Sequence, residues 1–206
     1  MAKIKHTKNE LKAQRDALKR FTRYLPTLQL KKQQLQLEVR QLEARVEAKR
    51  AEEKQRRDEL ASWVKLFAEP VDWEKYLRIE EVRRGHNNIA GVNIPTLEAL
   101  AFARVAPDGF STPAWFDDGL SMLEALVRLR VERLVLEEQA QLLAAELQTT
   151  NQRVNLFEKV KIPAAEENIR VIRIFLGDQM TAEVARSKIA KGKSAPAPAD
   201  TAARSP

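Results

Sequence analysis

The chain has 206 residues, of which 32% are charged and 6% aromatic, and it contains six glycines and no cysteine. A composition rich in charge and poor in glycine is typical of long helices and excludes a sheet-rich globule with many tight turns. The lack of cysteine excludes disulfides and thiolate metal sites, and neither a signal peptide nor an apolar run long enough to span a membrane is present. We therefore expect a soluble, cytoplasmic protein whose net charge of +7 permits nucleic acid, anionic lipid or an acidic protein as partner.

The first predicted element is a coiled-coil arm over residues 1–68. Its apolar residues recur at spacings that average 3.5, which keeps one stripe of a helix facing a partner. Thr7 is placed to cap this helix, and Glu10 completes a capping box. Pro26 predicts a local bend, because the stripe continues in phase across it, and Glu69-Pro70 predicts the end of the arm. The stripe consists of Leu18, Phe21, Leu25, Leu28, Leu35, Val39, Leu42 and Val46.

A charged section then interrupts the stripe at Lys49, Glu53 and Arg56. We expect the partner helix to hold this section weakly, because it offers little apolar surface to bury. Two interpretations stay open: the section is solvated, or another protein docks on it. Apolar stripe positions resume at Leu60, Trp63 and Phe67.

The central section, residues 69–118, has a different character. Tyr76–Val82 and Ile89–Ile94 are short runs with β-branched residues, and the glycine and asparagines of Arg83–Asn88 suit a loop between two antiparallel strands. The sequence therefore predicts a β-hairpin, which Pro95 closes. Leu97–Val105 fits either a third strand or a short helix.

The second coiled-coil arm is predicted over residues 119–191. A turn at Pro107-Asp108-Gly109 precedes it, and Asp117 or Asp118 is placed to cap its helix. Its stripe has polar interruptions at Arg133 and Thr150 and consists of Met122, Leu126, Leu129, Leu136, Ala140, Leu143, Leu147, Val154 and Phe157.

Ile162-Pro163 predicts a kink or a brief interruption within this arm. Helix then resumes through Ile169, Ile172 and Leu176 to about Ala190. The small residues and prolines of 192–206 predict a disordered tail.

Two such arms joined by a small section predict a mainly α fold: a long antiparallel two-helix coiled coil with a central β-hairpin section at its turn and a disordered C-terminal tail. Antiparallel pairing places both basic ends of the arms at one tip. A solvated helix tip explains this charge as well as a binding surface does. The basic residues are Lys3, Lys5, Lys8, Lys12, Arg15, Lys19 and Arg20 in the first arm and Arg170, Arg173, Arg186, Lys188, Lys191 and Lys193 in the second.

The sequence gives no catalytic, cofactor-binding or metal site. The two histidines, His6 and His86, lack a second histidine or a carboxylate at metal-ligand spacing, and the glycines do not cluster as a phosphate-binding loop requires. The acidic pairs Glu52-Glu53 and Glu137-Glu138 are typical of solvated helix faces. Three tryptophans, Trp63, Trp73 and Trp115, bracket the central section and are expected to pack it onto the arms.

Several segments of the chain resemble those of one known family. In the C-terminal part these segments are Asn151–Glu158, Ile162-Pro163 and Asn168–Ile172. Earlier in the chain they are Thr7–Leu11, Leu28–Lys32, and Asn88–Val92 with Ile94-Pro95. In the right order along most of its length, the chain resembles the D-subunit family of V-type (A-type) rotary ATPases.

This resemblance implies a non-catalytic central rotor shaft that couples ATP synthesis or hydrolysis to proton or sodium transport. It also implies the partners: a hexamer of catalytic and non-catalytic nucleotide-binding subunits around the tip, a small F-type subunit beside the arms, and a funnel-shaped subunit above the membrane rotor ring. Membrane association would then occur only through the complex, on the cytoplasmic face, with no nucleic acid as partner. The basic tip would meet the inner surface of the hexamer.

Two alternatives come from other classes of protein. A prefoldin-like chaperone also joins two helices through a hairpin, but its arms are shorter and it has no place for the C-terminal segments. A basic coiled coil could also bind nucleic acid, but no aromatic stacking set lies among the basic residues.

Overall fold

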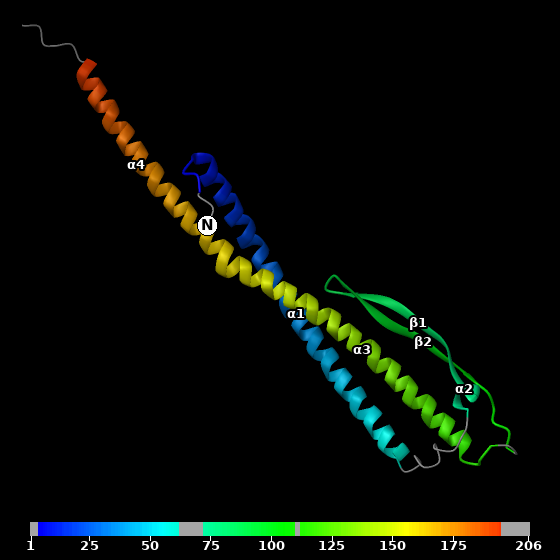
Figure 1. The fold of residues 1–206 in the computed structure, drawn as a ribbon. Helices are drawn as coiled ribbons and strands as arrows, with labels where there is room; N and C mark the ends of the chain where they lie inside the picture. Colours follow the sequence, from blue (N-terminus) through cyan, green and yellow to red (C-terminus); the bar gives the residue numbers. More distant parts are fainter. Residues whose placement is uncertain (1–3, 62–71, 110–111, 195–206) are drawn as a thin grey trace, which may run out of the picture. The chain divides into compact units, whose positions relative to one another are not determined.

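The computed structural model describes residues 4–61, 72–109 and 112–194. These residues are mainly helical, with a helical hairpin and a two-stranded antiparallel sheet, as predicted (Figure 1). They divide into two compact units: a terminal unit of residues 1–26 and 154–206, and a central unit of residues 27–153. The elements are α1 (Lys8–Ala61), α2 (Trp73–Tyr76), β1 (Leu77–Ile89), β2 (Val92–Arg104), α3 (Phe116–Leu156), a π-helical turn η2 (Phe157–Lys161) and α4 (Ile162–Ser194).

Helix α1 begins where the cap was predicted. The backbone N–H of Glu10 donates to Thr7 Oγ1 at 3.2 Å, which satisfies one of the free N–H groups of the first turn. The other half of the capping box is replaced, because the Thr7 N–H donates to Lys5 O and the Glu10 carboxylate accepts from Gln14. The helix continues through Pro26, as the uninterrupted stripe predicted.

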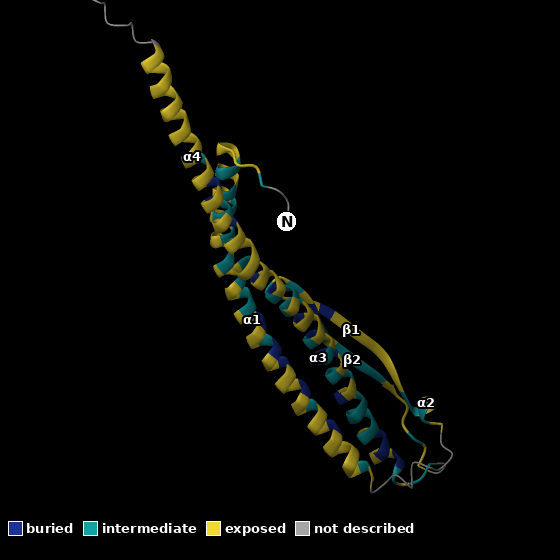
Figure 2. Cartoon of the chain, turned by 60° about the vertical axis from the view of Figure 1, so that its left-hand side comes forward, coloured by how far each residue is buried: buried dark blue, intermediate teal, exposed yellow. Residues whose placement is uncertain are grey.

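The core of the central unit is the predicted seam between α1 and α3. Leu35, Val39, Leu42 and Val46 of α1 are buried in one cluster with apolar residues of α3. The buried positions form a line along the facing sides of the two helices (Figure 2). The members from α3 and the sheet are Leu136, Leu143 and Ile94, with Ala140, Leu147, Ile89, Ala90 and Val92 packed against them.

The hairpin turn lies later than predicted. Arg83–Asn88 belongs to β1, and the chain reverses at Ala90 and Gly91, whose φ angles are 51° and 81°. Two successive positive φ angles are typical of the type I′ turn, whose twist matches that of a hairpin. Asn88 stabilises this turn from its edge, because its Oδ1 accepts from the Gly91 N–H at 3.0 Å and its Nδ2 donates to Asn93 at 2.7 Å.

Of the two alternatives for Leu97–Val105, strand is confirmed and helix is wrong, but the segment up to Arg104 continues β2 and does not form a third strand. Pro95 lies within β2, opposite His86, and does not close the hairpin. In a two-stranded sheet every strand is an edge strand, where proline is tolerated. Gly85, which suggested a loop, lies in the paired region, where the Glu98 side chain occupies the space that a Cβ would need.

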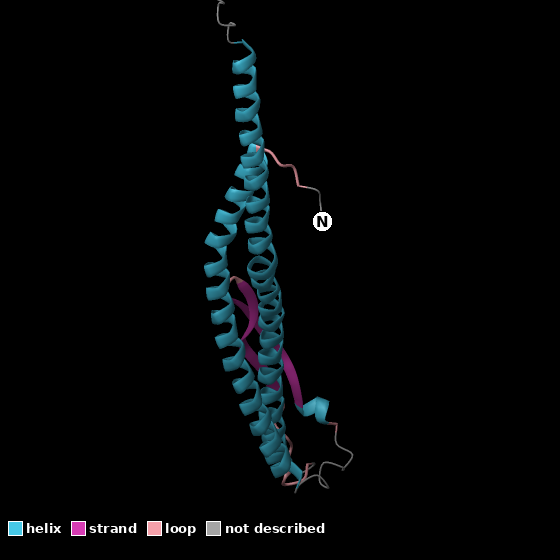
Figure 3. Cartoon of the chain, turned by 90° about the vertical axis from the view of Figure 1, so that its left-hand side faces the viewer, coloured by secondary structure: helices cyan, strands magenta, loops and turns pink. Residues whose placement is uncertain are grey.

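Helix α3 begins at Phe116, one turn before the predicted arm. Asp117 and Asp118 therefore lie inside its first turn and do not cap it. Carboxylates in this position still stabilise the helix through its dipole. The hairpin runs alongside α3, as Figures 1 and 3 show.

In the terminal unit, the predicted interruption before Pro163 is a π-helical turn. The N–H of Ile162 donates to Phe157 O, five residues back, and the wider turn accommodates one additional residue. The buried positions follow this shift: counting heptads from Val154 and Phe157 gives 161, 164 and 168, whereas the buried residues are Ala165 and Ile169, followed by Ile172. The π turn therefore rotates the apolar face of α4 by one residue.

Helix α4 continues to Ser194, beyond the predicted end near Ala190. Residues 192–194, which were assigned to the tail, are therefore helical. Residues 195–206 lie outside the described part of the chain, as do Trp63, Phe67 and Glu69-Pro70.

Candidate functional site

Lys49 and Glu53 of the charged section form ion pairs with α3, contrary to the expectation that this section would be weakly held, whereas Arg56 pairs with Glu59 of its own helix. Glu53 is buried, with 9% of its surface exposed, and accepts from Arg133 Nε at 2.7 Å and Arg130 at 3.2 Å. On either side of it, Lys49 pairs with Glu132 at 2.9 Å, and Arg50 and Arg133 share Glu137. The polar interruption predicted at Arg133 thus faces the charged section of α1. We call these residues the ion-pair ladder: Lys49, Arg50, Glu53, Arg130, Glu132, Arg133 and Glu137.

Two carboxylates of the ladder, those of Glu53 and Glu137, have pKa values below the ordinary one. Burial by itself would raise the pKa of Glu53, but the hydrogen bonds from Arg133 and Arg130 outweigh it and lower that pKa below its ordinary value. The hydrogen bond from Arg50, against the effect of burial and with help from Arg133, lowers the pKa of Glu137. Both carboxylates are therefore charged at neutral pH, and the four basic and three acidic residues of the ladder give it a formal charge of +1.

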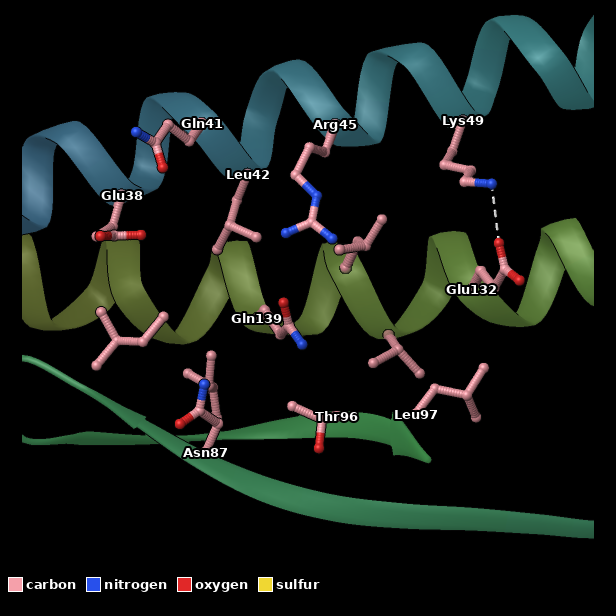
Figure 4. A pocket seen from close by; sticks show the side chains of 14 residues that line it. Glu38, Gln41, Leu42, Arg45, Lys49, Asn87, Thr96, Leu97, Glu132 and Gln139 are labelled. Atoms are coloured by element: carbon pink, nitrogen blue, oxygen red, sulfur yellow. Dashed lines mark ion pairs between the residues drawn. The ribbon is translucent and has the colours of Figure 1, made fainter. Parts of the chain in front are cut away.

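A groove of about 410 Å³ lies between α1, α3 and the hairpin. Figure 4 shows Arg45 and Lys49 extending into it from α1, Glu132 and Gln139 from α3, and Thr96 from the hairpin. Gln139 is buried and donates to Pro95 O at 2.5 Å, which fixes β2 against α3. The groove has polar walls and an apolar floor that includes Val135 and Leu136.

The base of the hairpin is anchored by aromatic rings. The ring centroid of Trp73 lies 6.0 Å from that of Trp115 and 4.9 Å from that of Phe116. The Tyr76 ring contacts the Phe116 ring edge-on, with centroids 4.9 Å apart. Phe116 is completely buried. Trp73 and Trp115 therefore pack the central section onto α3, as predicted. Arg104 adds a polar anchor through its ion pair with Asp117.

The terminal unit brings the two basic ends together, as the antiparallel prediction required. Asn168 of α4 donates to Gln14 of α1 at 3.4 Å, and His6 lies against Phe175 with ring centroids 4.8 Å apart. Residues 4–26 carry seven lysines and arginines against two acids. Residues 177–193 of α4 are exposed, and the C-terminal part of this helix is yellow in Figure 2. Its apolar residues Met180, Val184 and Ile189 are more than half exposed.

The histidines and acidic pairs that the sequence analysis considered as possible catalytic or metal residues do not come together at one site. His86 is exposed on β1, and His6 is occupied by its ring contact. The two acidic pairs were expected to be solvated. One member of each, Glu53 and Glu137, belongs instead to the ladder and forms ion pairs between α1 and α3. Within the described ranges, no three His, Cys, Asp or Glu side chains gather as a metal site would need, and no helix there is long and apolar enough to cross a membrane.

Sequence reasoning missed Gln139 and Arg130, which lie beside predicted stripe positions. A signal was available for Arg130: it is one turn from Arg133, so both guanidinium groups lie near one line along α3. Gln139 gave no such signal, because its partner is a backbone carbonyl on a distant strand.

Comparison with known proteins identifies the family. The family described as the D subunit of ATP synthase matches residues 10–192. The V-type ATP synthase D subunit of Borreliella burgdorferi is 46% identical over 191 residues, which cover 93% of this chain and 95% of that protein. The V-type ATP synthase D subunit of Chlamydia muridarum is 33% identical and that of Chlamydia trachomatis also 33%, each across 93% of this chain and 96% of the relative. The chain belongs to the ATP synthase D-subunit family.

Proposed function

We propose that this protein is the non-catalytic central-stalk rotor subunit of a V-type (A-type) rotary ATP synthase. The observation that carries the proposal is the family match over residues 10–192, which includes both helical arms and the hairpin. Rotation of the shaft would couple ATP synthesis or hydrolysis to proton or sodium transport. The protein would lie on the cytoplasmic face and reach the membrane only through the complex.

Paired helices suit this role physically. An asymmetric shaft favours a different conformation in each catalytic subunit around it, so that turning the shaft changes their nucleotide affinities in sequence. Such a shaft needs resistance to separation of its helices and no catalytic group of its own. The ion-pair ladder supports the proposal, because it joins α1 to α3 where the apolar seam stops.

The basic terminal unit is the part that we assign to the nucleotide-binding hexamer. Lys5, Lys8, Lys12 and Arg186 are exposed there, and Met180 and Val184 are available for apolar contacts. Exposed cations together with exposed apolar side chains favour a partner surface that offers both acidic and apolar groups. A small F-type subunit and a funnel-shaped subunit above the membrane ring complete the expected partners.

A tagged chain purified from solubilised native membranes tests the proposal. We expect the nucleotide-binding subunits and a small F-type subunit to co-purify at near-stoichiometric levels, and reversal of Lys5, Lys8, Lys12 and Arg186 to glutamate to weaken that recovery. RNA or unfolded clients without those subunits would replace the rotor with the nucleic-acid or chaperone alternative. The matched control reverses four basic residues of the central unit, namely Lys32, Arg40, Arg45 and Lys54.

A further inference from the structure

The terminal unit contains a groove lined by cations that form no ion pair with the described residues. The groove lies between the N-terminal part of α1 and α4, which are side by side in Figures 1 and 2, and has a volume of about 390 Å³. Its three basic residues are exposed: Arg15 and Lys19 on α1 and Arg173 on α4. None of the three has a hydrogen-bond partner within ranges 4–61, 72–109 and 112–194 either. We call this site the cationic groove, and it is lined by Arg15, Leu18, Lys19, Glu166, Ile169 and Arg173.

The arrangement of these cations is electrostatically unfavourable without an anion. Arg15 and Lys19 are four residues apart on one helix, where like charges repel each other. Arg173 adds a third positive charge from the facing helix. The one acidic lining residue, Glu166, forms no ion pair within the described part of the chain, so the lining residues keep a net charge of +2. In the ion-pair ladder, by contrast, two arginines share a carboxylate.

The terminal unit as a whole adds a positive field to that of the groove. Residues 1–26 and 154–206 contain 17 basic and eight acidic residues, a net charge of +9, whereas residues 27–153 contain 19 and 21, a net charge of −2. The net charge of +7 therefore comes entirely from the terminal unit. A field of one sign raises the local concentration of ions of the opposite sign. Anions are thus drawn to this unit, and in the cationic groove they meet basic side chains from two helices at once.

We propose that the cationic groove binds a polyphosphate chain, the group shared by nucleoside triphosphates and inorganic triphosphate. A guanidinium group donates two parallel hydrogen bonds to phosphate oxygens, and a lysine adds a point charge. Three cations favour an anion with several charges over a carboxylate or a single phosphate. Because Arg15 and Arg173 belong to different helices, a bound polyphosphate would join α1 to α4 and stabilise the terminal unit. The inference does not rest on the proposed function, since it concerns the chain by itself.

Isothermal titration calorimetry of the purified full-length chain with inorganic triphosphate tests the inference. Arg15→Gln with Arg173→Gln removes a cation from each wall of the groove. The control, Arg23→Gln with Lys188→Gln, removes the same charge from exposed residues of the same unit outside the groove. We expect the first variant to bind at least about tenfold more weakly, with unchanged helical circular dichroism, and the control no more than about twofold more weakly. No binding by the wild type, or equal losses in the two variants, would overturn the inference.

A gain of affinity supplies a second test, which loss of folding cannot imitate. Glu166→Gln removes the acidic lining residue and should bind triphosphate about threefold more tightly, whereas Glu183→Gln, on an exposed part of α4 outside the groove, should not. No gain from Glu166→Gln, or an equal gain from both, would contradict the assigned site.

Titration with ATP identifies the source of the phosphate chain. An affinity similar to that for inorganic triphosphate supports recognition of the phosphates alone, and a higher affinity assigns the ligand as a nucleoside triphosphate. Binding of ATP without binding of inorganic triphosphate would overturn the proposal, because the cationic side chains would then not be what holds the ligand.

Discussion

Replacing Glu53 by glutamine should lower the free energy of unfolding of the central unit by more than is typical for the loss of an exposed ion pair. Glu53 is 9% exposed and accepts from Arg133, whose side chain is 13% exposed. A hydrogen bond between charged groups of this kind contributes about 1.5–3 kcal/mol. The bond from Arg130 adds little, because that side chain is 51% exposed. Arg133 keeps Glu137 as a partner, so the full penalty of an unpaired buried charge is avoided, and we expect a loss of about 2 kcal/mol.

The assay is urea denaturation of the purified chain, followed by circular dichroism at pH 7. Glu52→Gln is the control, because Glu52 is half exposed and pairs with Lys49 one turn away; it should lose no more than about 0.5 kcal/mol. The pKa of Glu53 is lowered in the folded protein, so its contribution is present above its ordinary pKa of 4.5 and is lost as the pH falls through the lower folded value. The difference between wild type and Glu53→Gln should therefore shrink below about pH 4.5. Equal effects of the two variants, or a difference that is constant from pH 7 to 3, would refute this account of the ladder.

Three further changes test other parts of the fold by the same denaturation assay. Gly91→Ala should lower the free energy of unfolding by about 1 kcal/mol, because Gly91 has a positive φ of 81°. Gly177→Ala should raise it by up to about 1 kcal/mol, because Gly177 lies within α4 with open space around it. The reverse order would contradict the turn assignment. Phe116→Ala removes the completely buried ring of the aromatic cluster and should cost about 3–5 kcal/mol, so a loss below 1 kcal/mol would show that the cluster does not anchor the hairpin. Gln139→Ala leaves Pro95 O without its donor and should cost about 1–2 kcal/mol, with faster hydrogen exchange in β2; unchanged exchange would argue against this contact.

The helices were predictable because their signal is local and repeated. Each apolar residue of the α1 seam, from Leu35 to Val46, lies on the same face as its neighbours, so the pattern gives the buried side without knowledge of the partner. The cap at Thr7 depends on residues three apart and was equally accessible. Packing of Trp73 and Trp115 followed from their position at the two ends of one small section.

The turn and the ladder depend on information that a local pattern does not contain. Ala90 has a positive φ although alanine gives no sign of it, while Gly85, the stronger turn signal, is a paired residue beneath the Glu98 side chain. The charges at Lys49 and Glu53 looked solvated because the opposing arginines and glutamates are about 80 residues away in sequence. Which residues these charges pair with depends on the register between α1 and α3. The apolar stripes alone do not fix that register, because a shift by one heptad would pair them equally well.

The π turn before Pro163 changes the heptad register of the second arm. Phe157–Lys161 contains one residue more than a regular helix would have there, so the heptad count after the turn is shifted by one residue relative to the count before it. Replacing the proline leaves that surplus in place, because Ala165, Ile169 and Ile172 still need the rotated face. Deleting one residue from the turn would instead restore a regular helix and keep Ala165, Ile169 and Ile172 on the buried face, because regular heptads from Val154 would then reach them. In this chain the second arm therefore consists of two segments with separate heptad registers that meet at the π turn.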